Sequence, residues 1–322
     1  MIAVFLIFWF ISAFFIIREH RIIRIFIYFG VFSLITSICF LLLGAPDVAM
    51  AEAAINAFTT VFFIVCFEKY YELGADDESG KPRKISAKQT IKTLFKYIPH
   101  ALFVVLLFAL FVAHMPTIIS DIEINTYLKY QYIAHFMEDV GGENAVGAIY
   151  LGYRIYDTLF EALMLVVGVV AVIHMSEHTI AVVSKGKGSE VQRSGMAIFT
   201  IRIICPLLVI FGFYLMANGH ISPGGGFQGG LAIAAFFICR YMVYDIYDLP
   251  ILKVMKLEEA VFVTTVLLAI FVVFVGVADY LPIYDINIFQ GAYLMIMNFL
   301  IGAKVTCSFI ILFYRFIAVE RL

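Results

Sequence analysis

Long apolar runs are the feature that most limits what this chain can fold into. Of its 322 residues, 63% are hydrophobic and only 14% are charged, and the mean hydropathy is +0.99. Several runs approach or exceed the roughly 18 apolar residues that a helix needs to cross a bilayer. Because hydrocarbon offers no hydrogen-bond partners, a backbone in lipid must satisfy its own polar groups. The sequence therefore predicts an all-α polytopic membrane protein.

The apolar runs predict about nine transmembrane helices. They cover roughly residues 2–17, 22–43, 47–67, 98–115, 158–175, 197–217, 226–244, 259–278 and 289–314. A shorter run at 144–152 cannot span a bilayer unless it forms a half-helix.

Basic residues indicate the orientation of these helices. With the N-terminus outside, most of the 22 Lys and Arg residues fall in segments that lie inside, as the positive-inside rule requires. The C-terminus then also lies inside.

Two linkers divide the predicted helices into three groups. Residues 74–84 are charged and carry a Gly and a Pro, and residues 184–194 are polar and contain Gly, so both stretches are typical of solvated connections. The sequence predicts a three-span domain at 1–75, a linker with a two-span domain at 76–183, and a four-span domain at 184–322.

A polar, glycine-dense stretch, NGHISPGGGFQGG at residues 218–230, interrupts the last domain. Ser222 and Pro223 are typical of a helix N-cap and a first helical residue, so we expect a helix that begins there and continues with Gly224. The pairs Gly225/Gly229 and Gly226/Gly230 have the spacing of small residues that let helices approach closely.

Two side chains in this stretch could also handle protons. His220 is its one group that titrates near neutral pH, and Gln228 is a neutral relay candidate. A tight turn with a packing face remains the alternative to a site here.

Carboxylates mark the starts of two predicted spans. Asp47 lies at a helix N-terminus, where a cap is the simpler interpretation, while Glu52 lies about one and a half turns deeper. A carboxylate at such a depth must be paired, protonated or in contact with water. Asp157 and Glu161 share one helix face, with an interfacial ion pair to Arg154 as the simpler role for Asp157. Glu161 is deeper and is a candidate for proton handling.

Two cations lie inside predicted spans of the last domain. Arg202 is early in its span, so its side chain can extend to the membrane surface or serve as a charge partner. Lys304 lies too deep in its span for its side chain to reach the membrane surface, so its amine needs a carboxylate partner or must lose its proton.

Several classes of function are not supported. The five cysteines, Cys39, Cys66, Cys205, Cys239 and Cys307, are dispersed through apolar runs without a C-x-x-C pair. The sequence has no nucleophile–base pair, no metal-binding pattern and no basic helix suited to nucleic acid. We therefore expect neither a bound cofactor or metal nor an enzymatic activity of its own.

Three stretches together resemble a known family. GAPDVAMAEAA, from residue 44, resembles the small three-span subunit shared by Mrp-type cation/proton antiporters and membrane-bound hydrogenases. AIYLGYRIYDTLFEALML, from residue 148, resembles the next, two-span component. NGHISPGGGFQGG, with ADYLPIYD from residue 278 and NFLIGAKV from residue 298, resembles the four-span B-type component of Mrp antiporters.

The resemblance implies a cell-membrane subunit of a multi-subunit Na⁺/H⁺ antiporter-type module, with other Mrp-like subunits as partners and Na⁺ or H⁺ as transported ions. The residues that it implies for the ion path are Asp47, Glu52, Asp157, Glu161, His220 and Lys304. A hydrogenase-like or other redox arm could drive such a module. The alternative is a scaffold that bridges such an arm to the true antiporter subunits without handling ions.

Overall fold

The computed structural model describes residues 2–71, 126–179, 195–244, 250–278 and 287–317, and single positions 106, 109, 110 and 113. The chain forms two compact units, of which residues 1–70 with 136–322 make the first and residues 71–135 the second. Nearly all described residues belong to the first unit, and their regular structure is entirely helical. The predicted all-α class is thus confirmed for this part of the chain.

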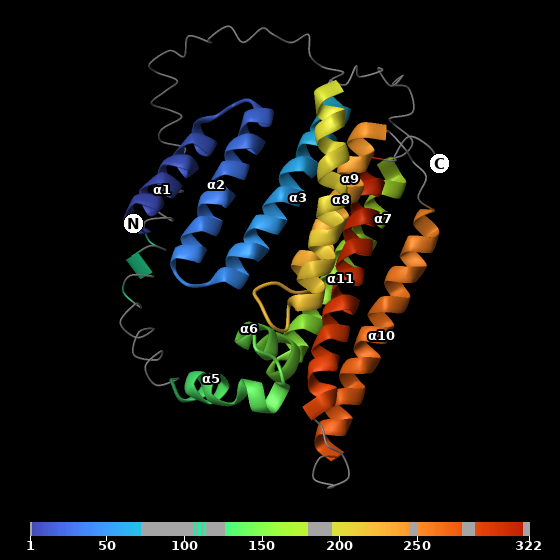
Figure 1. The fold of residues 1–322 in the computed structure, drawn as a ribbon. Coiled ribbons are helices and arrows are strands. Elements are labelled where there is room, and N and C mark those ends of the chain that lie inside the picture. The colour runs from blue at the N-terminus through green and yellow to red at the C-terminus, as the bar shows by residue number, and fades with distance from the viewer. Residues whose placement is uncertain are drawn as a thin grey trace, which may run out of the picture. The chain divides into compact units, whose positions relative to one another are not determined.

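The helices follow the chain in the order shown in Figure 1. They are α1 (Ile2–Arg18), α2 (Ile22–Leu42), α3 (Pro46–Tyr71), α5 (Thr126–Val140), α6 (Ala145–Ala148), a π-helical turn η2 (Ile149–Tyr153), α7 (Ile155–Thr179), α8 (Gly195–Asn218), α9 (Gly226–Tyr244), α10 (Ile251–Ala278) and α11 (Asn287–Ile317).

Among the described residues, 6 helices are long and apolar enough to cross a membrane. They lie at Ile22–Leu42, Pro46–Phe67, Ile155–Met175, Ile198–Asn218, Ile251–Phe274 and Gly291–Phe316. The chain is therefore a multi-pass membrane protein. The predicted span 98–115 falls almost wholly outside the described residues, and both the total of about nine spans and the orientation of the termini stay predictions.

Helix α11 is the centre of the first unit. Of its membrane-length window, 67% is buried, against 11–17% in the other five candidate spans. Helices α7, α8, α9 and α10 all pack against it, as Figure 1 shows for the yellow, orange and red helices. A helix surrounded by other helices can hold polar side chains away from lipid, whereas an outer helix exposes them.

Glycines let α9 approach α11 and α8 closely. A Cβ added at Gly230 would lie 2.5 Å from the Gly302 carbonyl oxygen of α11, and one at Gly229 would lie 2.6 Å from the Gly212 carbonyl oxygen of α8. Gly226 faces the α11 backbone around Gly302 in the same way. The structure gives these glycines a packing role, because any side chain would force the helices apart.

The N-terminal helices join this bundle through α3. Ser37 Oγ donates to the Ala49 carbonyl oxygen at 2.6 Å, and Asn56 Nδ2 donates to the Gly30 carbonyl oxygen at 3.0 Å, so polar side chains link α2 to α3. On its other side α3 packs Phe58 edge-on against Phe309 of α11, with ring centroids 4.7 Å apart.

The predicted start of α9 is wrong. The helix begins at Gly226, four residues after the expected N-cap, and the Ser222 hydroxyl instead donates back to the Asn218 carbonyl oxygen of α8 at 3.2 Å. Gly224 and Gly225 have φ values of +150° and +146°, which a helix cannot contain. Their extended, glycine-only backbone turns the chain instead of starting the helix, and Pro223 lies in that turn.

Replacing Gly230 with Ala should destabilise the protein by about 1–3 kcal/mol, because the new methyl group overpacks the α9–α11 contact. The measurement is unfolding of the detergent-solubilised protein by heat or denaturant. Gly168→Ala in α7 is the matched control, since a Cβ there meets nothing within 4 Å. Equal stability of the two variants would contradict the close-packing interpretation.

Candidate functional site

A buried polar triad joins α10 to α11. Lys304 is 1% exposed, and Glu258 and Ser308 are also buried. The Lys304 ammonium forms an ion pair with the Glu258 carboxylate and donates to Ser308 Oγ at 2.9 Å, while the Ser308 hydroxyl donates to Glu258 Oε1 at 3.1 Å. Each member of the triad therefore contacts both others, and the two charges compensate each other inside the helix bundle.

Glu258 is the carboxylate partner of Lys304. It was not among the site residues selected from the sequence. Glu258 lies at the boundary between a predicted inside segment and a predicted span. A charged side chain can reach water at such a boundary, so its charge needs no buried partner. A signal was present, because Glu258 and Glu259 are adjacent and two neighbouring helical residues cannot share a face. In the structure Glu258 is buried and Glu259 is exposed.

A second polar cluster surrounds Asp47 at the N-terminus of α3. The Asp47 carboxylate is buried, and its Oδ1 accepts from Asn144 Nδ2 at 3.0 Å and from the Gly224 backbone N–H at 3.2 Å. Asn144 Nδ2 also lies 3.2 Å from the Gly219 carbonyl oxygen and 3.1 Å from that of Ser222. Residues from all three predicted domains thus meet at one carboxylate.

Asn298 of α11 extends this cluster. Its Oδ1 accepts from the Gly226 backbone N–H at 3.0 Å and from the Tyr150 hydroxyl at 3.2 Å. Burial, and then the nearby Asp47 and Glu161 carboxylates, raise the pKa of Tyr150, so its hydroxyl stays a neutral donor. The Asn298 Nδ2, wholly buried, has no partner within the described part of the chain.

Glu52 lies apart from both clusters. It is half-buried in α3, and the Ser33 hydroxyl of α2 donates to its carboxylate. Of the arrangements expected for a carboxylate at this depth, the structure shows a polar partner within the N-terminal three-helix block.

The charged candidates on α7 and α8 are exposed. Arg154 pairs with Asp157 at 2.5 Å, with side chains that are 60% and 56% exposed, which is the simpler, interfacial arrangement considered for them. Glu161 lies one turn further along α7, also exposed. Arg202 is exposed on α8, as expected for a side chain that extends to the membrane surface.

His220 takes part in the Asp47 cluster through its backbone. Its carbonyl oxygen accepts from the Asn144 backbone N–H at 3.0 Å. The ring Nδ1 is buried and has no partner among the described residues. Gln228 is half-buried, with its Oε1 beside Gly225. The glycine turn therefore contributes mainly backbone groups to the cluster.

Asn144, Tyr150 and Asn298 were not selected from the sequence as site residues. Asn144 precedes an apolar run in the position of an N-cap, and it does cap α6 by accepting from the Val146 N–H at 3.0 Å. Asn298 is a neutral amide within an apolar run, a weaker signal than the charge of Lys304. Their importance depends on contacts across the fold that no local pattern reports.

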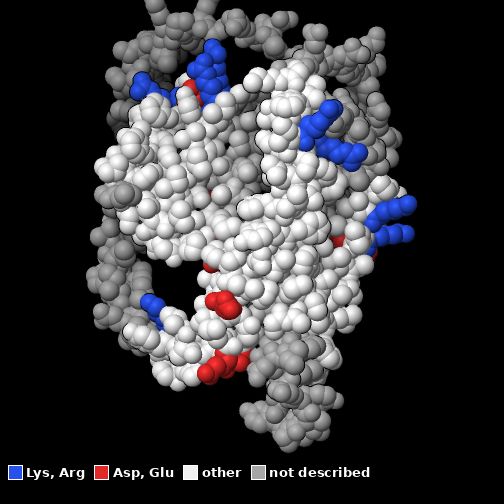
Figure 2. All heavy atoms as spheres, in the orientation of Figure 1, with Lys and Arg blue, Asp and Glu red and all other residues white. Residues whose placement is uncertain are grey.

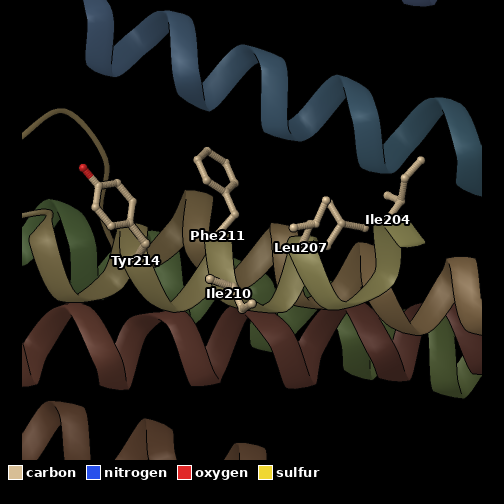
Figure 3. Close-up of a pocket in the computed structure, with 6 residues that line it drawn as sticks. Ile204, Leu207, Ile210, Phe211 and Tyr214 are labelled. Atoms are coloured by element: carbon tan, nitrogen blue, oxygen red, sulfur yellow. The ribbon is translucent and has the colours of Figure 1, made fainter. Parts of the chain in front are cut away.

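An apolar depression on α8 is separate from the polar clusters. Its lining residues are Ile204, Leu207, Leu208, Ile210, Phe211 and Tyr214. Figure 3 shows Ile204, Leu207, Phe211 and Tyr214 projecting from one side of α8. Apart from the Tyr214 hydroxyl these side chains are apolar and none is charged, so this surface suits lipid or a partner helix better than an ion.

Removing Lys304 alone should be more damaging than removing the whole pair. Lys304→Met leaves Glu258 buried without its cation and should cost about 3–5 kcal/mol of stability, whereas adding Glu258→Leu should restore most of that loss. Unfolding of the two variants in detergent provides the measurement. Arg154→Ala is the exposed-pair control, expected to cost about 0–1 kcal/mol. A double variant less stable than the single one would contradict the pairing.

Comparison with protein families finds two matching stretches. Residues 196–311 match the domain related to the MnhB subunit of the Na⁺/H⁺ antiporter, and residues 7–72 match MbhD, a subunit of MBH. The predicted resemblances of the last and the first domain are thereby confirmed, whereas the exact domain boundaries stay predictions.

Individual relatives support the same assignment. The putative antiporter subunit mnhA2 of Staphylococcus haemolyticus is 27% identical over 151 residues, which are 46% of this chain and 17% of that protein. The putative antiporter subunit mnhB2 of the same organism is 40% identical over 47 residues, 15% of this chain and 33% of that protein. The chain thus spans only a minor part of the length of these two relatives.

A solved structure shares the fold. The Mrp complex from Dietzia sp. DQ12-45-1b matches with a TM-score of 0.61 and 19% identity, over 95% of this chain and 34% of that one. The Asp47 cluster contains residues of both matched stretches, and the Lys304 triad lies inside the second. This chain is therefore similar to subunits of Mrp-type antiporter modules, through an MbhD match at residues 7–72 and an MnhB-related match at residues 196–311.

Proposed function

We propose that the chain is a membrane subunit of a multi-subunit Na⁺/H⁺ antiporter-type module, and that the Lys304–Glu258–Ser308 triad lies on its ion or proton path. The observation that carries the proposal is this buried ion pair inside the MnhB-related domain. The family matches support the transport role.

The energetics of the triad favour function over stability. Desolvation of each buried charge costs several kcal/mol, roughly, and well-packed apolar residues often stabilise a protein as much as a buried ion pair does. Intramembrane charges therefore mark ion and proton pathways more often than structural needs.

The triad can bind the two transported ions in alternation. When a proton or Na⁺ binds Glu258, the carboxylate loses its attraction for Lys304, whose ammonium keeps a hydrogen bond to Ser308. When the ion leaves, Lys304 again neutralises the carboxylate. While Glu258 is occupied, the Lys304 ammonium lacks a counter-charge, so this state is costly unless Lys304 also gives up its proton.

Exposed groups within the membrane suggest that other subunits cover this chain. Glu161 is exposed in the second turn of α7, inside the candidate span, where lipid would disfavour a carboxylate. A neighbouring antiporter-like subunit would place it, together with Asp157, beside polar partners. Such a subunit is the main partner that we propose, and a hydrogenase-like or other redox arm is a further candidate that would supply the driving force.

The proposed orientation has the N-terminus outside and the C-terminus inside. In Figure 2 the Lys and Arg side chains visible on this face lie mainly in its upper half, and several Asp and Glu side chains lie lower down. This distribution supports placing the upper side in the cytoplasm.

A scaffold role is the second candidate. The Asp47 cluster favours it, because a carboxylate bound to a backbone N–H and an amide can serve purely to hold domains together. In that case charge-removing substitutions would impair assembly of the complex and leave transport by the assembled fraction unchanged.

Glu258→Gln should lower Na⁺-linked proton movement by at least about ten-fold in vesicles that contain the assembled complex, because the amide cannot take up a proton. Lys304→Ala and Glu161→Gln test, in the same assay, whether Lys304 and Glu161 also lie on the ion path. Glu259→Gln is the matched control, since it removes the adjacent, exposed carboxylate.

Subunit composition is measured on the same vesicles, so that assembly and transport are read separately. Full transport by an intact complex carrying Glu258→Gln would refute the path assignment. Loss of the complex itself, with normal transport in what remains, would establish the scaffold role.

A further inference from the structure

Residues 141–153 lie outside both family matches and yet contact both matched domains. They form the loop before α6, α6 itself and η2. We call them the docking segment. The segment is well packed, with Asn144, Gly147, Ala148 and Leu151 buried.

Toward the MnhB-related domain, the docking segment makes hydrogen bonds along its whole length. The Asn144 N–H donates to the His220 carbonyl oxygen at 3.0 Å, and the Tyr150 hydroxyl donates to Asn298. At the far end, the Tyr293 hydroxyl of α11 donates to the Leu151 carbonyl oxygen at 3.0 Å. These bonds set the position of the segment against the glycine turn and α11.

The docking segment and the glycine turn fit closely because both contain glycines at their contact. A Cβ added at Gly147 would lie 3.0 Å from the Gly219 carbonyl oxygen, and one at Gly142 would lie 3.2 Å from the His220 carbonyl oxygen. On the opposite surface, a Cβ at Gly225 would collide with the Tyr150 hydroxyl. The glycine-dense turn is therefore complementary in shape to this segment.

Toward the MbhD domain, the contact is the Asn144–Asp47 hydrogen bond. The Asn144 amide performs two tasks at once, since Oδ1 caps α6 while Nδ2 faces the Asp47 carboxylate and two carbonyl oxygens of the glycine turn. An Asp at this position would have no donor for these three acceptors and would place a second negative charge beside Asp47.

We propose that residues 141–153 are an interaction surface for the glycine turn of an MnhB-type domain, and that Asn144 is its main anchor. The surface joins the two matched domains without relying on the peptide connection between them. We therefore expect the two matched domains to stay together after the chain is cut between them. The proposal concerns association and does not depend on the ion-path assignment.

The test uses the full-length chain with an N-terminal affinity tag and a protease cleavage sequence placed within residues 184–194. After cleavage in mild detergent, the C-terminal fragment is followed on the tagged resin over time. Wild-type halves should stay together. Asn144→Ala and Gly147→Ala should release the C-terminal fragment roughly ten-fold faster than the wild-type chain does. The Asn144 variant loses buried hydrogen bonds, and the Gly147 variant disturbs the close fit.

Two controls separate docking from general damage. Arg154→Ala removes an exposed ion pair just after the segment, and Gly168→Ala fills open space on α7. Both should retain the fragment as wild type does. Heat stability of each uncut variant shows whether it folds, and Asn144→Ser, which keeps a capping oxygen for α6, is the second variant if Asn144→Ala does not fold. Rapid release from the wild-type chain, or unchanged retention in the folded Asn144 and Gly147 variants, would overturn the proposal.

Discussion

The bonds to the Asp47 carboxylate are the interaction on which the arrangement of the domains depends. The carboxylate lies at the N-terminus of α3, and it accepts from Asn144 and from the Gly224 N–H. A buried carboxylate without donors would cost several kcal/mol, roughly, so its partners must stay in place whenever the domains are assembled. The unusual backbone of the glycine turn follows from this requirement, because Gly224 can present its N–H there with φ at +150°.

Helix α11 connects this cluster to the charged triad. It carries Asn298 beside the glycine turn and Lys304 beside Glu258, six residues apart, which corresponds to about 9 Å along the axis. Both polar groups are tolerated because neighbouring helices surround α11 on most sides. A change in the charge of the triad is therefore close enough to affect the helix that anchors the domain interface.

Much of the fold and part of the candidate site could be predicted from the sequence alone. The positions of the described spans follow from uninterrupted apolar runs, because a backbone in lipid has few alternatives to a helix. Lys304 could be selected because an amine so deep in a span cannot reach water and needs either a carboxylate partner or the loss of its proton. The start of α9 could not be predicted, since Ser222–Pro223 satisfies a local capping rule that the tertiary contacts of Gly224 and Gly225 override.

The sequence by itself determined the helical class, the membrane location and the presence of costly buried charges, because these depend on the chemistry of each segment with its solvent. Only the tertiary structure decided that Glu258 and not Glu259 faces Lys304, and that Asn144 reaches both Asp47 and the glycine turn. Those contacts join residues 46, 97 and 75 positions apart. Such pairings depend on how helices pack, and local patterns of residues do not encode which distant side chain meets which.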